Sequence, residues 1–191
     1  LVSGYNRVRE LTAASTADTR VRREASVPAA ELAEIYRDRV PDGVHAVRDE
    51  QFYEWRFQNP DYDYATYLAT EAGESAGLVV GRSVGEGGKT IARIVDVVPL
   101  SPHVRSGRVA ALLDAVLEAN ADTDLIVAPE TAFPGEVLRE RGFHSEGSLP
   151  LSYLKDGRTH VVRSLNGWDA HDVELRRREN WTKTFAELDT S

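Results

Sequence analysis

Apolar residues recur at strand spacing through the middle of the chain, and this pattern predicts an antiparallel sheet. The strands expected from it cover residues 64–70, 76–84 and 89–98. Short turns, one polar and one rich in glycine, separate these strands and favour direct antiparallel connections. The last strand is apolar on both faces apart from Arg93 and Asp96, which indicates a central position in the sheet. An earlier strand at 20–27 carries Arg23 among its apolar residues and is expected at an edge.

Apolar residues at helical spacing predict four helices beside these strands. They cover residues 28–39, 49–57, 105–120 and 134–142. The third is the clearest, because its apolar residues form one stripe, made of Val109, Leu112, Leu113, Val116 and Leu117. A short buried strand is expected at 124–128, directly after this helix. A helix between two strands indicates a βαβ crossover, so the strands at 89–98 and 124–128 are expected to be parallel.

The order of these elements predicts an α+β fold with a mixed central sheet and flanking helices. A closing hairpin is expected from 149–154 and 158–164, around the turn sequence Lys155-Asp156-Gly157. We expect one domain at 19–165, preceded by an extension or the remnant of another module at 1–18. Residues 166–191 carry too much apolar material for a free linker. This tail is expected to dock either on the domain's own sheet or at an interface with a second copy or a neighbouring module.

Composition removes several classes of function. The 191-residue chain has no cysteine, which excludes disulfides, thiolate catalysis and cysteine-bound zinc, and its five histidines lack the short spacings of a metal site. A net charge of −8 argues against nucleic acid as a partner. With no apolar run long enough for a membrane span and no signal pattern, we expect a cytoplasmic protein.

Two further features of the composition concern the origin of the chain. Only Lys89, Lys155 and Lys183 are lysines, and an acidic chain with few lysines resembles proteins of salt-loving archaea. The chain contains no methionine, which suggests that it begins inside a longer reading frame.

The ordered set of elements over residues 19–165 resembles the GNAT N-acetyltransferase superfamily. Local phrases are similar too: YATYLATEAGESAGLVVGR to the two central strands of that fold, IVDVVPL to its fourth strand, and GEVLRERGFHSEG to its last helix and the Gly-Phe strand that follows. The resemblance implies a GNAT fold and a cytoplasmic transferase that uses acetyl-CoA or a related acyl-CoA.

The part of that family that binds the cofactor is the turn after the fourth strand, where glycines and the start of a helix present backbone N–H groups to the CoA pyrophosphate. Here Gly107 falls on the first glycine of the family pattern and Val109 falls where a second is usual. The resemblance implies that the pyrophosphate is held by the amides of Arg105, Ser106, Gly107, Arg108 and Val109. It also implies that the backbone of Val97 and Val98 lines the pantetheine arm.

The acid and the base of the reaction depart from the family pattern. Leu138 stands where many members have the tyrosine that protonates the CoA thiolate, and Tyr153 on the expected following strand is the alternative donor. Asp96 is the candidate base, because a carboxylate in an apolar strand is costly unless it is paired or functional. Its alternative role is a salt bridge with Arg93 or with an arginine of a neighbouring helix.

Three hypotheses follow from the sequence. The first is an acyltransferase that moves an acetyl group from acetyl-CoA to a primary amine, with Phe52, Trp55 and Phe57 either lining the acceptor pocket or packing in the core. The second is a non-catalytic GNAT-fold module that binds a ligand or a partner domain. The third, suggested by the phrase WRFQNP and by the fragment-like start of the chain, is a tandem-GNAT aminoacyl transferase or polysaccharide-modifying transferase.

Overall fold

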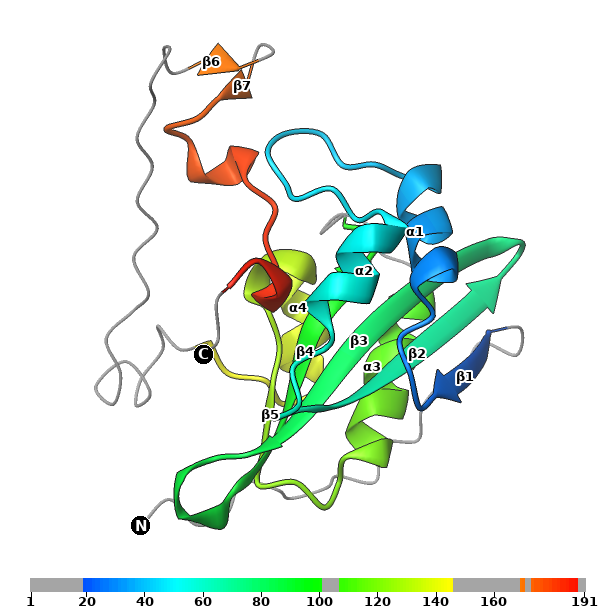
Figure 1. Cartoon of the computed structure of the whole chain (residues 1–191), viewed down its shortest axis with the longest axis vertical. Helices are drawn as coiled ribbons and strands as arrows, with labels where there is room; N and C mark the ends of the chain where they lie inside the picture. The colour runs from blue at the N-terminus through cyan, green and yellow to red at the C-terminus, as the bar shows by residue number, and fades with distance from the viewer. Residues whose placement is uncertain (1–18, 101–106, 146–168, 171–172, 189–191) are drawn as a thin grey trace.

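The structure is a computed structural model, and it describes residues 19–100, 107–145, 169–170 and 173–188. Up to residue 140, its helices and strands follow the order expected from the sequence (Figure 1). They are β1 (Arg20–Glu24), α1 (Ala29–Asp38), α2 (Glu50–Arg56), β2 (Asp63–Glu71), β3 (Glu74–Val84), β4 (Thr90–Val98), α3 (Gly107–Ala119), β5 (Leu125–Val127), α4 (Gly135–Glu140), β6 (Asp169–Ala170) and β7 (Val173–Glu174). Short 3-10 turns are η1 (Glu86–Gly88), η2 (Glu130–Ala132), η4 (Arg178–Asn180) and η5 (Phe185–Glu187).

The central sheet has five strands in the order β1-β2-β3-β4-β5. Strands β1 to β4 are antiparallel neighbours, and β4 and β5 are parallel, with α3 connecting them. The prediction of an α+β fold with an antiparallel meander and one βαβ crossover is therefore confirmed. The element order from β1 to α4 is the one that the GNAT resemblance implies. The hairpin expected at 149–164 and the extension at 1–18 lie outside the described residues.

Helices cover the sheet on both faces (Figure 1). On one face, α3 and α4 pack over a core that includes Leu78, Ile94, Leu112 and Leu138. On the other face, a second core lies beneath α1 and α2; its residues include Leu32, Ile35, Tyr36, Tyr53, Leu68, Val79 and Val98. Each core buries one set of alternating strand residues, as a two-faced sheet requires.

A register shift between β3 and β4 decides which way Asp96 points. Val80 lies opposite Ile94, but Val79 lies opposite Asp96, so β4 carries one extra residue at this bulge. Residues that face each other across a ladder share a side of the sheet, and Val79 belongs to the core beneath α1 and α2. The bulge therefore turns the Asp96 side chain toward α2 and away from α3.

Local signals explain where the helices begin and end. The Asp49 side chain accepts a hydrogen bond from the Phe52 N–H at 2.8 Å and caps α2, and Pro28 stands at the N-cap of α1. Gly142 has φ of +79°, a conformation that glycine adopts at little cost, and it ends the turn that follows α4. The observed ends differ from the predicted ones by one or two residues, within the usual fraying of helix termini.

Candidate functional site

The first feature of the candidate site is a divergence between β4 and β5. Their parallel pairing covers only Ile91–Arg93 of β4 and Leu125–Val127 of β5, whereas β4 continues to Val98. Pro129 follows β5 closely, cannot donate a ladder hydrogen bond, and leads the chain into η2. Beyond Arg93, the edge of β4 that faces away from β3 is thus no longer paired with β5.

The second feature is the start of α3, the helix that follows β4 in the chain. Gly107 is its first residue and is exposed, so no side chain covers the backbone there. The first N–H groups of a helix have no partner within the helix and carry a partial positive charge. Gly107, Arg108 and Val109 form this first turn, and the predicted partners Arg105 and Ser106 lie outside the described residues, as does Tyr153.

The side chains of Arg108 and Val109, in the first turn of α3, contact other parts of the protein. The Arg108 guanidinium donates to the backbone oxygen of Glu71 at 3.1 Å and forms an ion pair with Glu74 at the β2–β3 turn. Val109 is buried and packs in the core beneath α3. Only the backbone N–H groups of these two residues are available to an anion.

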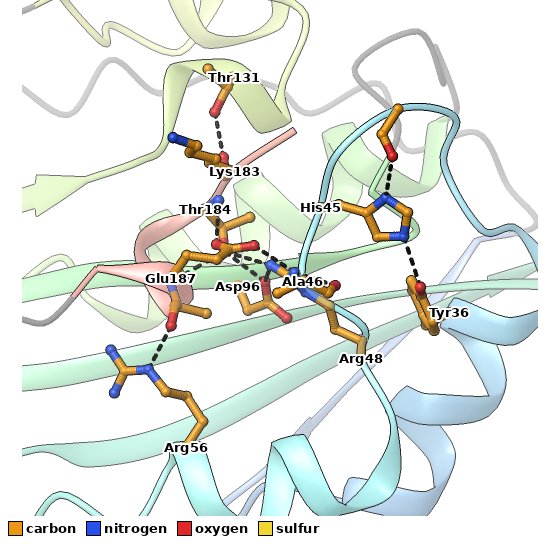
Figure 2. A network of polar contacts seen from close by, with 12 residues as sticks. Tyr36, His45, Ala46, Arg48, Arg56, Asp96, Thr131, Lys183, Thr184 and Glu187 are labelled. Carbon is orange, nitrogen blue, oxygen red and sulfur yellow. Dashed lines mark hydrogen bonds and ion pairs between the residues drawn. The ribbon is translucent and has the colours of Figure 1, made fainter. Parts of the chain in front are cut away.

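The third feature is a buried polar network around Asp96, shown in Figure 2. Asp96 is 1% exposed and Arg48, in the segment before α2, is 0% exposed. Arg48 Nη2 donates to Asp96 Oδ1 at 3.0 Å, and the Tyr53 hydroxyl donates to Oδ2 at 3.0 Å. Thr184 Oγ1 donates to Oδ1 at 2.7 Å. Both oxygens of the carboxylate are therefore engaged.

The arginine that pairs with Asp96 is Arg48 and not Arg93. Arg93 donates instead to the Tyr62 hydroxyl at 2.8 Å, and its guanidinium carbon lies 5.8 Å from the centre of the Phe185 ring. The sequence indicated that Asp96 needs a partner, but Arg48 lies in a stretch without periodic spacing, so nothing in the pattern pointed to it.

Burial and charge act together on the groups around Asp96. Burial alone would lower the pKa of Arg48, but the carboxylates of Asp96 and Glu187 outweigh it, and the pKa is raised above its usual value. Burial also raises the pKa of the Tyr53 hydroxyl, and the charge of Asp96 beside it adds to the rise. Arg48 stays charged and Tyr53 stays protonated, so both remain donors to Asp96.

Residues near the C-terminus cover the Asp96 network. We call residues 180–188 the C-terminal segment; it contacts β4 and lies between Arg56 of α2 and Thr131 of η2 (Figure 2). Glu187 Oε1 lies 2.5 Å from Arg48 Nη1, and Thr184 is 2% exposed. In this arrangement the Asp96 carboxylate is closed off from solvent.

The aromatic residues in α2 and at its C-terminal end differ in their surroundings. Phe52 and Phe57 pack against the core beneath α1 and α2, and their rings meet edge to face with centroids 6.4 Å apart. Trp55 is 71% exposed and lies on the solvent side of the helix. Core packing therefore accounts for Phe52 and Phe57.

The described part of the chain contains neither a cluster of metal ligands nor a helix suited to a membrane. No group of three or more histidine, cysteine, aspartate or glutamate side chains is placed to hold a metal ion among the described residues. No described helix is long and apolar enough to cross a membrane.

Comparisons with known proteins show a similarity to solved structures only. No family model matches the chain, and no curated protein matches it. Among solved structures, it is similar to the crystal structure of ribosomal-protein-alanine N-acetyltransferase from Brucella melitensis biovar Abortus 2308, with a TM-score of 0.48 and 16% sequence identity. The match covers 76% of this chain and 99% of that chain.

Proposed function

We propose that this protein is a GNAT-type acyltransferase that moves an acetyl group from acetyl-CoA to a primary amine. The observation that carries the proposal is the edge of β4 beyond Arg93, which is not paired with β5. The next helix in the chain is α3, and Gly107 is exposed at its start. An extended chain with amide groups can bond to such an edge, and a pyrophosphate can accept hydrogen bonds from such a turn.

The cofactor residues follow from this placement. Backbone at Val97 and Val98, the last residues of β4, lines the pantetheine arm. The amides of the α3 start hold the pyrophosphate; they belong to Arg105, Ser106, Gly107, Arg108 and Val109. Because the Val109 side chain packs in the core, its N–H can serve without the side chain entering the cofactor's path.

The reaction is a direct transfer. The amine nitrogen attacks the thioester carbonyl carbon, and a backbone N–H of β4 stabilises the oxyanion that forms. The C–S bond then breaks, and the CoA thiolate takes a proton from Tyr153 or water while the amine loses one to a base. Asp96 can act as that base only when the C-terminal segment moves off it, because Thr184 and Glu187 of the segment cover the carboxylate, which is 1% exposed.

The enclosed Asp96 also favours a second candidate function. In that alternative the chain is a non-catalytic module of the same fold, and the Asp96 network is purely structural. A cytoplasmic location and a neighbouring module of the same kind are further proposals, for which the support is the sequence alone.

A Gly107→Glu substitution tests the cofactor site. Gly107 is exposed, so the new side chain should be tolerated, but its carboxylate would lie beside the pyrophosphate. We expect the Kd for acetyl-CoA, measured by isothermal titration calorimetry, to rise at least about tenfold, the equivalent of ~1.4 kcal/mol.

The matched control is Gly135→Glu, at the first residue of α4, where a side chain would meet nothing within 4 Å. This variant carries the same added charge at the same place in a different helix, and its Kd should equal that of the unmodified chain. Equal affinity in all three proteins would show that the pyrophosphate does not lie at the start of α3.

A further inference from the structure

The C-terminal segment is held largely through its main chain, as a bound peptide would be. The Val44 N–H donates to the Asn180 oxygen at 2.7 Å, and the Thr182 N–H donates to the Val44 oxygen at 3.0 Å. Such pairing with an extended stretch is a recurrent way of binding peptides, and it uses groups that every polypeptide has.

Two side chains of the body reach further main-chain oxygens of the segment (Figure 2). Arg56, at the end of α2, donates through Nε to the Ala186 oxygen at 2.6 Å and through Nη2 to the Leu188 oxygen at 2.8 Å. On the other side, the Thr131 hydroxyl of η2 donates to the Lys183 oxygen. Side chains of α2 and η2 therefore bind the main chain of the segment from two sides, where β4 and β5 diverge.

Two side chains of the segment supply selectivity. Thr184 donates to Asp96 and accepts from Arg48 Nη2 at 3.1 Å, and Glu187 pairs with Arg48 Nη1. The same two residues shape their own turn, because the Thr184 N–H donates to Glu187 Oε2 at 2.8 Å and the Ala186 N–H donates to Thr184 Oγ1 at 3.2 Å. The site therefore suits a hydroxyl residue followed three positions later by glutamate.

Departure of the segment would expose Thr184 and Ala186 but would leave the two core clusters intact. None of its residues belongs to either of the two core clusters formed by the described residues. Once it has left, Asp96 still pairs with Arg48 and accepts from Tyr53, and Arg48 still donates to the Ala46 oxygen at 2.7 Å. No buried charge is left alone, so the main obstacle to removing a buried ionic group is absent.

We propose that the surface formed by Val44, Arg48, Arg56, Asp96 and Thr131 is a polypeptide-binding site. Its ligand is a peptide with a Ser/Thr-x-x-Glu turn, and the chain's own residues 180–188 occupy it. The site meets β4 at Asp96, the residue before Val97, and the acyl chain is proposed to run along the backbone of Val97 and Val98. The acceptor is therefore a polypeptide that displaces the segment, an extension that rests on the proposed transferase function.

The test uses a fluorescent peptide with the sequence of residues 180–188 and the full chain carrying Thr184→Val and Glu187→Ala, which weaken the resident segment. An attached segment competes at a high effective concentration, so we expect the peptide to bind this variant at least about tenfold more tightly than the unmodified chain in fluorescence anisotropy. Adding Arg56→Met to the variant should remove most of that binding. A peptide with the same two substitutions should compete at least about tenfold less well.

Absence of binding at millimolar peptide, or equal competition by the substituted peptide, would overturn the proposal. If the variant does not fold, hydrogen exchange in the unmodified chain provides the test. Excess peptide should displace the segment and accelerate exchange of the Thr184 and Ala186 amides. Unchanged exchange rates would overturn the proposed site. Neither measurement contains acetyl-CoA. If the peptide does not bind, the proposed cofactor site is unaffected by that result. If acetyl-CoA does not bind, the proposed peptide site is likewise unaffected.

Discussion

Replacing Arg48 with methionine should lower the free energy of unfolding by about 3–5 kcal/mol. The substitution keeps the length of the side chain but leaves the Asp96 carboxylate, which is 1% exposed, without its only ionic partner among the described residues. An unpaired buried charge is among the most costly single defects in a protein interior. Urea denaturation followed by circular dichroism measures the change.

Two controls separate this effect from a general loss of arginine. Arg22→Met removes an arginine whose side chain is 48% exposed and pairs with Glu24 and Glu31, so it should cost less than about 1 kcal/mol. The double variant Arg48→Met/Asp96→Leu removes both buried charges and should recover most of the loss. A single Arg48→Met loss as small as that of Arg22→Met would mean that the network is not buried as described.

Shortening Leu112 to alanine should cost about 2–5 kcal/mol of unfolding free energy. Leu112 is 0% exposed in the stripe of α3 that packs on the sheet, so the change removes apolar contacts and leaves a cavity. The same denaturation experiment measures it. Because α3 also begins the proposed cofactor site, acetyl-CoA should partly offset the loss by binding only the folded chain.

Leu125→Ala is the matched control for this prediction. Leu125 lies in β5 but is 52% exposed, so the same change of side chain should cost less than about 1 kcal/mol. Similar losses at the two positions would contradict the packing of α3 against the sheet.

The sequence predicted the elements well where side-chain periodicity is strong. The stripe of α3 was read directly from apolar residues at helical spacing, and four of its members, Val109, Leu112, Leu113 and Val116, are buried. The strand at 124–128 was predicted longer than the observed β5, because a run of apolar residues does not show that the next element turns away at Pro129. Periodicity locates an element, but its length depends on neighbours.

The candidate site was predictable only in part. A carboxylate in an apolar strand marked Asp96 as a residue that needs a partner, and that expectation holds. Its partners came from distant places, with Arg48 48 positions earlier and Thr184 88 positions later. The extra residue of the bulge that turns Asp96 toward α2 lies in β4, opposite Val79 and Val80, and β4 itself contains no glycine that would mark it. Contacts of this kind are set by tertiary packing and not by local pattern.

The most direct test of the account is a calorimetric titration of the full chain with acetyl-CoA. We expect a single-site isotherm with a Kd between about 1 µM and 1 mM, the range in which enzyme substrates commonly bind. The same ligand should raise the melting temperature, because it binds only the folded chain. If acetyl-CoA at millimolar concentration produces no heat and no thermal shift, this result contradicts the proposal that the edge of β4 and the start of α3 form an acyl-CoA site.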